Sequence, residues 1–193
     1  MFSRRSCIDQ IPFSTLWRYL KTYCDSISKV ITSAVNTQHE ISQPIKQLFT
    51  SYDHCMLRWA KGIASHIKEA NIKHQLEIYF QHILLMAITK ALYYQRINKL
   101  STALAILESV DHIFNKLKES LNPKSLHICG RYIMSIGNVY MDCISPKAAI
   151  WYLLNALTYF STENDILCKD KVQLHFLRND AKKAYFLHKN VKV

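Results

Sequence analysis

The sequence predicts an all-α fold, and three observations carry that prediction. The 193 residues include only three glycines and four prolines, the residues on which tight turns depend. Long segments place apolar residues at every third or fourth position, which is the spacing of one helix face. No segment keeps the alternating pattern of a strand, and 49% apolar with 20% charged residues is the composition of an ordinary globular domain.

Two helices are expected in the N-terminal part of the chain. The first spans about 15–35 behind Ser14, a favourable N-cap residue. The second follows Ser42 and Pro44, an N-cap and an early-turn proline, and runs to about residue 67, either unbroken or interrupted near 51–53. The predicted apolar positions are Trp17, Leu20, Tyr23 or Cys24, Ile27, Ile31 and Ala34 in the first helix and Leu48, Cys55, Trp59, Ile63 and Ile67 in the second.

Five further helices are expected, over about 73–96, 101–119, 125–143, 146–160 and 166–188. The first of them is apolar on most sides between Tyr79 and Tyr94, so we expect it to be buried. Ser101 is the expected N-cap of the next helix. Asn122-Pro123 marks a break because proline cannot continue a helix, and Ser145-Pro146 is again an N-cap followed by a proline.

An internal repeat relates two of these helix pairs. The alignment starts from Ala103 over Ala149, a separation of 46 residues in the numbering. It then places Ala91 over Gly137, Tyr94 over Tyr140, Leu104 over Ile150, Leu107 over Leu153 and Val110 over Ala156. Each repeat is therefore a helix, a short turn and a second helix with small residues at fixed offsets.

The second repeat resembles the tetratricopeptide repeat. The positions that carry the resemblance are Ile133, Ile136-Gly137, Tyr140, Ala149, Leu153 and Ala156-Leu157. In that motif Gly137 and Ala149 would be small where two antiparallel helices cross. The separation of the two repeats is longer than that of the standard repeat, which is about 34 residues. In the first repeat, Lys90-Ala91 replaces the expected Leu-Gly. The stretch 104–160 is similar in outline to the longer helix pairs of kinesin light chains and bacterial peptide-receptor proteins.

We therefore expect antiparallel helix pairs stacked as a short tetratricopeptide-like superhelix, or a helical bundle in which Gly137 only permits a close crossing. The chain is interpreted as one all-helical domain, 1–193. Within it, 1–72 holds N-terminal helices without a clear repeat, 73–161 holds the tetratricopeptide-like pairs, and 162–193 is a basic C-terminal capping helix.

The formal charge of +11 is concentrated toward the ends of the chain, since residues 169–193 carry seven Lys/Arg against two Asp. A basic excess favours polyanions, and it also describes the solvated face of a capping helix. The candidate polyanion-binding residues are Lys169, Lys171, Arg178, Lys182, Lys183 and Lys189.

No pattern in the sequence indicates catalysis, so we expect no enzyme, no cofactor and no metal site. The His/Cys pairs His54-Cys55 and His127-x-Cys129 lack the doubled spacing of a structural zinc site. The six cysteines form no C-x-x-C and are interpreted as reduced thiols of a cytoplasmic or nuclear protein. The Arg- and Ser-containing N-terminus leaves mitochondrial targeting as an alternative.

The predicted function is a non-catalytic protein–protein interaction module, an adaptor, scaffold or complex subunit, that binds a partner segment on a tetratricopeptide-like concave face. Lys90 and Arg131 suit an acidic partner. The full set of candidate contacts is Lys90, Tyr93, Arg131, Tyr132 and Asn138. The alternatives are a basic helical protein that binds nucleic acid or anionic membrane through its charged termini, and an obligate subunit of a hetero-complex.

Overall fold

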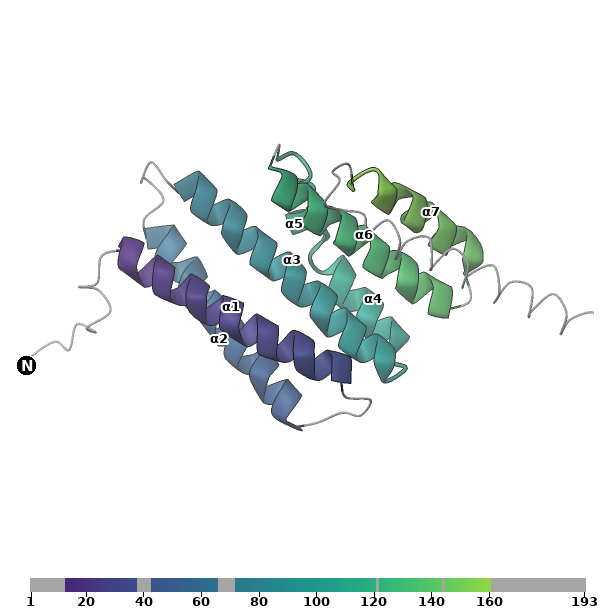
Figure 1. Ribbon diagram of the computed structural model, residues 1–193, viewed down its shortest axis with the longest axis horizontal. Helices are drawn as coiled ribbons and strands as arrows, with labels where there is room; N and C mark the ends of the chain where they lie inside the picture. The colour runs from purple at the N-terminus through teal and green to yellow at the C-terminus, as the bar shows by residue number, and fades with distance from the viewer. Residues whose placement is uncertain (1–12, 38–42, 66–71, 121, 144, 161–193) are drawn as a thin grey trace, which may run out of the picture. The chain divides into compact units, whose positions relative to one another are not determined.

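The computed structural model describes residues 13–37, 43–65, 72–120, 122–143 and 145–160. These residues form seven helices and no strand, so the predicted all-α fold is confirmed (Figure 1). The helices are α1 (Phe13–Thr37), α2 (Gln43–Ser65), α3 (Ile72–Arg96), α4 (Leu100–Glu108), α5 (Asp111–Leu117), α6 (Pro123–Asp142) and α7 (Pro146–Leu157).

The chain divides into two compact units, Met1–His82 (unit 1) and Ile83–Val193 (unit 2), and the division falls inside α3. The boundary predicted between 1–72 and 73–161 falls at the start of α3 and differs from this division. The predicted capping helix at 162–193 and the predicted targeting segment at the N-terminus lie outside the described residues.

The start of α1 differs from the prediction, because the helix begins at Phe13 and Ser14 therefore lies in its first turn and not at the N-cap. Helix α2 runs unbroken through 51–53, which settles the alternative left open there. Helix α3 ends near Asn98, whose φ of 58° is a left-handed conformation that Asn tolerates better than most residues. The Lys99 amide then donates to the Tyr94 carbonyl at 2.8 Å, which closes the helix end.

The single helix predicted over 101–119 is wrong: the segment forms α4 and α5, separated at Ser109-Val110. The Ser109 hydroxyl donates to the Ile106 carbonyl at 2.7 Å, and such a local bond competes with the helical ladder. Ser101 lies inside α4, whose N-cap is Lys99 and has no side-chain capping bond.

The predicted break at Asn122-Pro123 forms the N-terminus of α6. Asn122 is the N-cap, and its side chain accepts from the Lys124 amide at 3.0 Å. Pro123 occupies the first helical turn, where its missing N–H has no consequence. Ser145 is the N-cap of α7 by position, although its side chain makes no capping bond.

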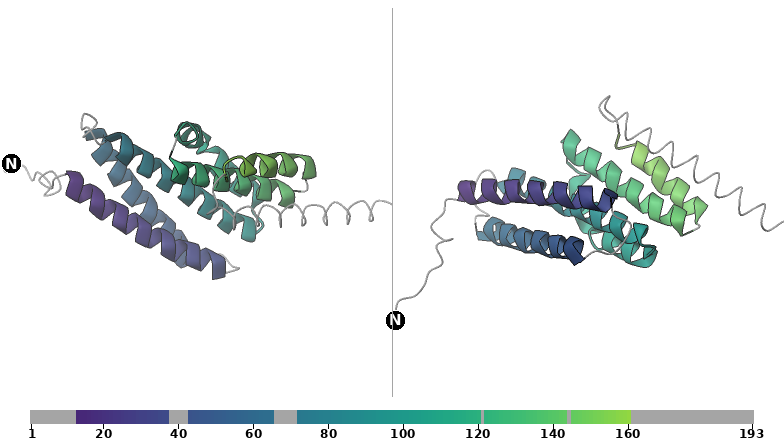
Figure 2. Two further views of the ribbon diagram at one scale, coloured as in Figure 1. Left: turned by 45° about the horizontal axis from the view of Figure 1, so that its top comes forward. Right: turned by 60° about the horizontal axis from the view of Figure 1, so that its bottom comes forward.

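In unit 1, α1 packs along α2, and Figure 2 shows the two helices side by side. The residues buried between and beneath them are Leu20, Cys24, Ile27, Ile31 and Val35 of α1 and Ile45, Phe49, Tyr52, Cys55, Met56, Trp59 and Ile63 of α2. Cys24 therefore faces the core, whereas Tyr23 is 42% exposed. Trp59 is fully buried and its ring contacts the rings of Tyr79 and His82.

In unit 2, α6 packs on α7 at a close crossing. A Cβ atom placed on Gly137 would lie 3.1 Å from Leu153 Cγ and 3.3 Å from Tyr152 Cβ. The prediction that Ala149 lies opposite Gly137 is wrong, because the side chain nearest to Gly137 is that of Leu153. Gly130 is approached still more closely, because its Cβ would lie 2.5 Å from the Phe160 ring.

Candidate functional site

A groove of about 320 Å³ runs between α1 and α2 in unit 1. The residues that line it are Tyr19, Leu20 and Tyr23 of α1 and Ser51, His54, Cys55 and Arg58 of α2. The volume lies at the lower end of the range of sites that bind small molecules or peptide side chains. The groove combines two aromatic side chains, a guanidinium, an imidazole and a thiol.

The wall formed by α1 presents exposed aromatic surface. The rings of Tyr19 and Tyr23 stack with centroids 6.5 Å apart and planes 8° apart. Tyr19 is 68% exposed although it is a large hydrophobic side chain. Exposed tyrosines next to an arginine are the residue types that dominate the energetics of protein–protein interfaces.

The opposite wall supplies positive charge. Arg58 and His54 are exposed on α2, and no ion pair from the described part of the chain occupies the Arg58 guanidinium. The described residues of unit 1 carry seven Lys/Arg against three Asp/Glu. The groove therefore lies in a basic environment that favours an anionic group.

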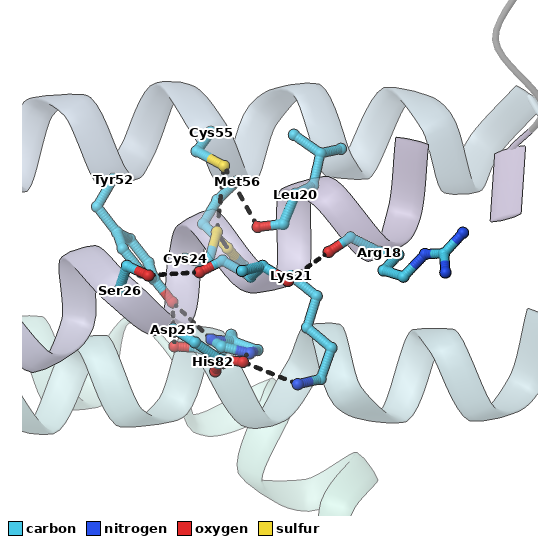
Figure 3. A network of polar contacts seen from close by, with 11 residues as sticks. Arg18, Leu20, Lys21, Cys24, Asp25, Ser26, Tyr52, Cys55, Met56 and His82 are labelled. Atoms are coloured by element: carbon cyan, nitrogen blue, oxygen red, sulfur yellow. Dashed lines mark hydrogen bonds and ion pairs between the residues drawn. The ribbon is translucent and has the colours of Figure 1, made fainter. Parts of the chain in front are cut away.

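A polar network lies beside the groove and joins α1, α2 and α3 (Figure 3). The Tyr52 hydroxyl donates to the His82 carbonyl at 3.1 Å and lies 3.2 Å from His82 Nδ1. The other ring nitrogen of His82, Nε2, is 3.3 Å from Asp25 Oδ1, and Lys21 Nζ forms an ion pair with Asp25 Oδ2 at 2.8 Å. These bonds satisfy polar groups that burial would otherwise destabilise, and they fix the helices that form the groove.

Three sulfur atoms meet between α1 and α2, next to this network. The Sγ atoms of Cys24 and Cys55 are 3.1 Å apart, and Cys24 Sγ lies 3.8 Å from Met56 Sδ. Cys55 Sγ also lies 3.9 Å from the Leu20 carbonyl. Both cysteines are free thiols and both are buried, but Cys55 also lines the groove.

The two thiols have different pKa values because their surroundings differ. The hydrogen bond with Cys55 and burial raise the pKa of Cys24 well above its ordinary value. The hydrogen bond from Cys24, aided by the charge of Arg58, lowers the pKa of Cys55 although burial opposes the shift. Burial, with a contribution from the charges of both thiols, raises the pKa of Tyr52, so its hydroxyl stays protonated.

The five residues predicted to contact a partner do not form one exposed set. Tyr93 and Tyr132 are 2% and 1% exposed, and the Tyr132 hydroxyl donates to the Leu107 carbonyl at 2.9 Å inside the core. Neither tyrosine offers surface to a partner in this conformation, so both serve the core of unit 2. Lys90, Arg131 and Asn138 are half-buried.

The six basic residues predicted to bind a polyanion lie in 161–193, outside the described residues. Among the residues that are described, no group of three or more His, Cys, Asp and Glu side chains is placed to hold a metal ion. None of the described helices combines the length and the hydropathy that crossing a bilayer requires.

No protein-family model, curated protein or solved structure matches this chain. The tetratricopeptide-like character of the helix pair α6–α7 therefore stays a prediction.

Proposed function

We propose that this chain is a non-catalytic protein–protein interaction module that binds an acidic segment of a partner protein in the groove between α1 and α2. The observation that carries the proposal is the lining of the groove, because the stacked Tyr19 and Tyr23 of α1 and the basic Arg58 of α2 border the same cavity of about 320 Å³. This is the combination found at interface hot spots, an aromatic anchor beside a charge-assisted hydrogen-bond donor.

Charge selects the class of partner. Arg58 has no carboxylate partner among the described residues, and the surrounding unit is basic. A carboxylate of the partner would pair with the guanidinium, and an adjacent aliphatic or aromatic side chain would cover the exposed ring of Tyr19. The groove is too small for a whole helix but accommodates two or three side chains of an extended segment.

The polar network supports this role because it fixes the helices that form the groove. A preformed site loses less conformational entropy on binding than a site that must be ordered by its ligand. The contact of Asp25 with His82 ties α1 to α3, and that of Tyr52 with His82 ties α2 to α3. We expect the backbone of the groove to change little when the partner binds.

The experiment is selection from a library of displayed random peptides with the full chain as bait. We expect the selected peptides to be acidic and to carry an aliphatic or aromatic residue near the acids. Replacement of Arg58 by Glu should weaken binding of the best peptide about 30-fold, and Tyr19→Ala about tenfold. The matched control is Lys116→Glu, an exposed residue of α5 with the same change of charge, which should leave the affinity unchanged.

Two results would contradict the proposal. The first is selection of peptides without acidic residues that bind the Arg58→Glu variant as well as the native chain. The second is loss of peptide binding in a variant with the basic residues of 169–193 replaced by Gln, with Arg58→Glu having no effect. The second result would favour the alternative of polyanion binding through the C-terminal segment.

We also propose that α6 and α7 are a tetratricopeptide-like helix pair. The close approach of Leu153 to Gly137 is the observation that favours it. The aligned residues Ala103 and Ala149, and likewise Leu107 and Leu153, are all fully buried, as equivalent positions of a repeat should be. An Arg131→Glu variant tests whether this pair also binds a partner, because it should reduce peptide affinity only if the predicted concave face contributes.

A further inference from the structure

The thiols of Cys24 and Cys55 form a pair that the interaction function does not need. They come from two packed helices, 31 positions apart in the sequence, and their Sγ atoms lie 3.1 Å from each other. Cys24 is fully buried and Cys55 is 4% exposed. An apolar pair would fill this space equally well, so their proximity suggests that the sulfur chemistry itself is used.

The make-up of the cluster indicates which chemistry. A tetrahedral metal ion needs ligands beyond two thiolates, and among the described residues no third His, Cys, Asp or Glu side chain joins the pair to hold one. A disulfide has an S–S length of about 2.05 Å. The two atoms would therefore need to approach by about 1 Å to form the bond, a shift that rotation of the side chains can supply.

The two thiols differ in their access to the groove and in their pKa. Cys55 lines the groove, where Arg58 and His54 of the same helix are exposed. Cys24 faces Cys55 from α1, and its pKa is raised by the hydrogen bond with Cys55 and by burial, with a smaller contribution from the charge of Asp25. The hydrogen bond from Cys24, with a smaller contribution from the charge of Arg58, lowers the pKa of Cys55 and favours its thiolate. Cys55 is therefore the thiol of the pair that borders the groove and the one whose thiolate is favoured.

We propose that Cys55 and Cys24 are a peroxide-reactive thiol pair, in which Cys55 is the attacking thiol at the floor of the groove and Cys24 is the resolving thiol. The reagent is a hydroperoxide, hydrogen peroxide being the smallest. The Cys55 thiolate attacks one peroxide oxygen, the S–O bond forms, and the O–O bond breaks. The departing hydroxide takes a proton and leaves as water, and Cys55 becomes a sulfenic acid.

Cys24 completes the reaction. Its sulfur attacks the Cys55 sulfur, the S–S bond forms, and the S–O bond breaks. The hydroxide leaves with the Cys24 proton as a second molecule of water. Two thiols are oxidised to one disulfide while one peroxide is reduced to two waters, so atoms and electrons balance. This reaction depends on the sulfur pair alone and not on which partner the groove binds.

The decisive experiment treats the reduced full chain with hydrogen peroxide, blocks the remaining thiols by alkylation, and maps the cysteines by peptide mass spectrometry. We expect a cross-linked peptide that contains Cys24 and Cys55, with the loss of two hydrogen atoms in mass. Buried Cys129 is the internal control, since burial raises its pKa to about 12. It should be oxidised at least about tenfold more slowly than Cys55.

Variants separate the two roles. In Cys24→Ser, the sulfenic acid of Cys55 should persist and be trapped by dimedone, because no resolving thiol faces it. In Cys55→Ser, Cys24 should not react with peroxide. Circular dichroism verifies that each variant is folded. If a variant does not fold, the mass-spectrometric mapping of the cross-link in the native chain still tests the proposal. Absence of the Cys24–Cys55 cross-link in the native chain, or trapping of the sulfenic acid on Cys24, would overturn the proposal.

The pH profile gives an independent readout. A thiol reacts as its thiolate, and the pKa of Cys55 lies below the ordinary value of 9.0. The rate of alkylation of Cys55 by iodoacetamide should therefore reach half of its maximum below pH 9. Exposed Cys143 is the comparison, because burial and the charge of Asp142 raise its pKa, and its half-maximum should lie above pH 9. The reverse order would count against Cys55 as the attacking thiol.

Discussion

The two compact units of this chain differ in what fills their cores. Around α6 and α7 the buried side chains of unit 2 are mostly apolar, although Ser125 and the Tyr132 hydroxyl are also buried, and small residues such as Gly130 and Gly137 let side chains of the facing segment approach the helix backbone. The core of unit 1 holds two thiols, a tyrosine hydroxyl and an imidazole that meet between three helices. Its buried polar side chains include Gln75, Gln81 and His82.

The difference between the two cores indicates where in the chain the functional chemistry lies. A buried hydrogen bond contributes only about 1 kcal/mol to folding, because it replaces bonds that the same groups make with water in the unfolded chain. Close packing accounts for most of the buried residues around α6 and α7, whereas packing alone does not explain why unit 1 keeps two cysteines in contact beside a groove. We therefore expect the functional chemistry of the described chain in unit 1.

The largest effect is expected in the core of unit 1, at Trp59. Its side chain is fully buried against the rings of Tyr79 and His82. Replacement by Ala removes a large apolar surface and leaves a cavity, so the free energy of unfolding should fall by about 4 kcal/mol. Chemical denaturation followed by circular dichroism measures it. Leu57→Ala is the control on the same helix, because Leu57 is 60% exposed and its loss should cost at most about 0.5 kcal/mol.

Oxidation of the two thiols should raise the free energy of unfolding, whereas Trp59→Ala lowers it. A disulfide between Cys24 and Cys55 closes a loop between residues 31 positions apart, which reduces the entropy of the unfolded chain and should raise the free energy of unfolding by about 3 kcal/mol. Comparison of urea unfolding before and after peroxide treatment tests this. No change in the Cys55→Ser variant is the matched control, and an equal gain in that variant would mean that another pair of cysteines is responsible.

In unit 2 the sensitive position is Gly137. A leucine there would overlap Leu153 and Tyr152, which an added Cβ alone already meets at 3.1 and 3.3 Å, so Gly137→Leu should lower the free energy of unfolding by about 2 kcal/mol. Gly137→Ala should be near neutral, because the gain of about 1 kcal/mol in helix propensity offsets the tight contact. Full stability of the leucine variant would refute the close crossing and, with it, the tetratricopeptide-like pair.

A matched pair of hydroxyl deletions compares the two cores directly. Tyr52 and Tyr132 are both 1% exposed, and each donates to a backbone carbonyl, that of His82 and that of Leu107. Tyr132→Phe should cost about 1 kcal/mol, and Tyr52→Phe about 1.5 kcal/mol, because the latter also loses the contact with His82 Nδ1. Thermal unfolding of the two variants provides the comparison. Equal losses would show that the contact with His82 Nδ1 adds nothing to the stability of unit 1.

Local patterns in the sequence predicted most of the fold. The apolar period and the prolines placed α3, α6 and α7 within a few residues of their observed bounds. The break between α4 and α5 was not predictable in the same way, because Ser109 and Val110 are common within helices and the break depends on a hydroxyl bond that competes with the helix. The left-handed Asn98 is likewise a local feature without a unique sequence signal.

The candidate site was less predictable than the fold. The apolar pattern predicted that Cys55 lies on the buried face of its helix, and it left open whether Cys24 or Tyr23 does so in the first helix. These two positions were the signals in the sequence that pointed to the thiol pair. Their meeting depends on the register of α1 against α2, a long-range property that periodicity does not specify. The same holds for Tyr93 and Tyr132, whose amphipathic character suggested contact with a partner but which the packing of unit 2 buries.

Hydrogen–deuterium exchange of the full chain, with and without the acidic peptide selected in the display experiment, tests the central claim most directly. Binding in the groove should slow exchange of the amides around Tyr19–Tyr23 in α1 and Ser51–Arg58 in α2, the segments that line it. Exchange in α6 around Arg131 and Asn138 should stay unchanged. Protection confined to α6, with α1 and α2 unaffected, would contradict the groove of unit 1 as the binding site.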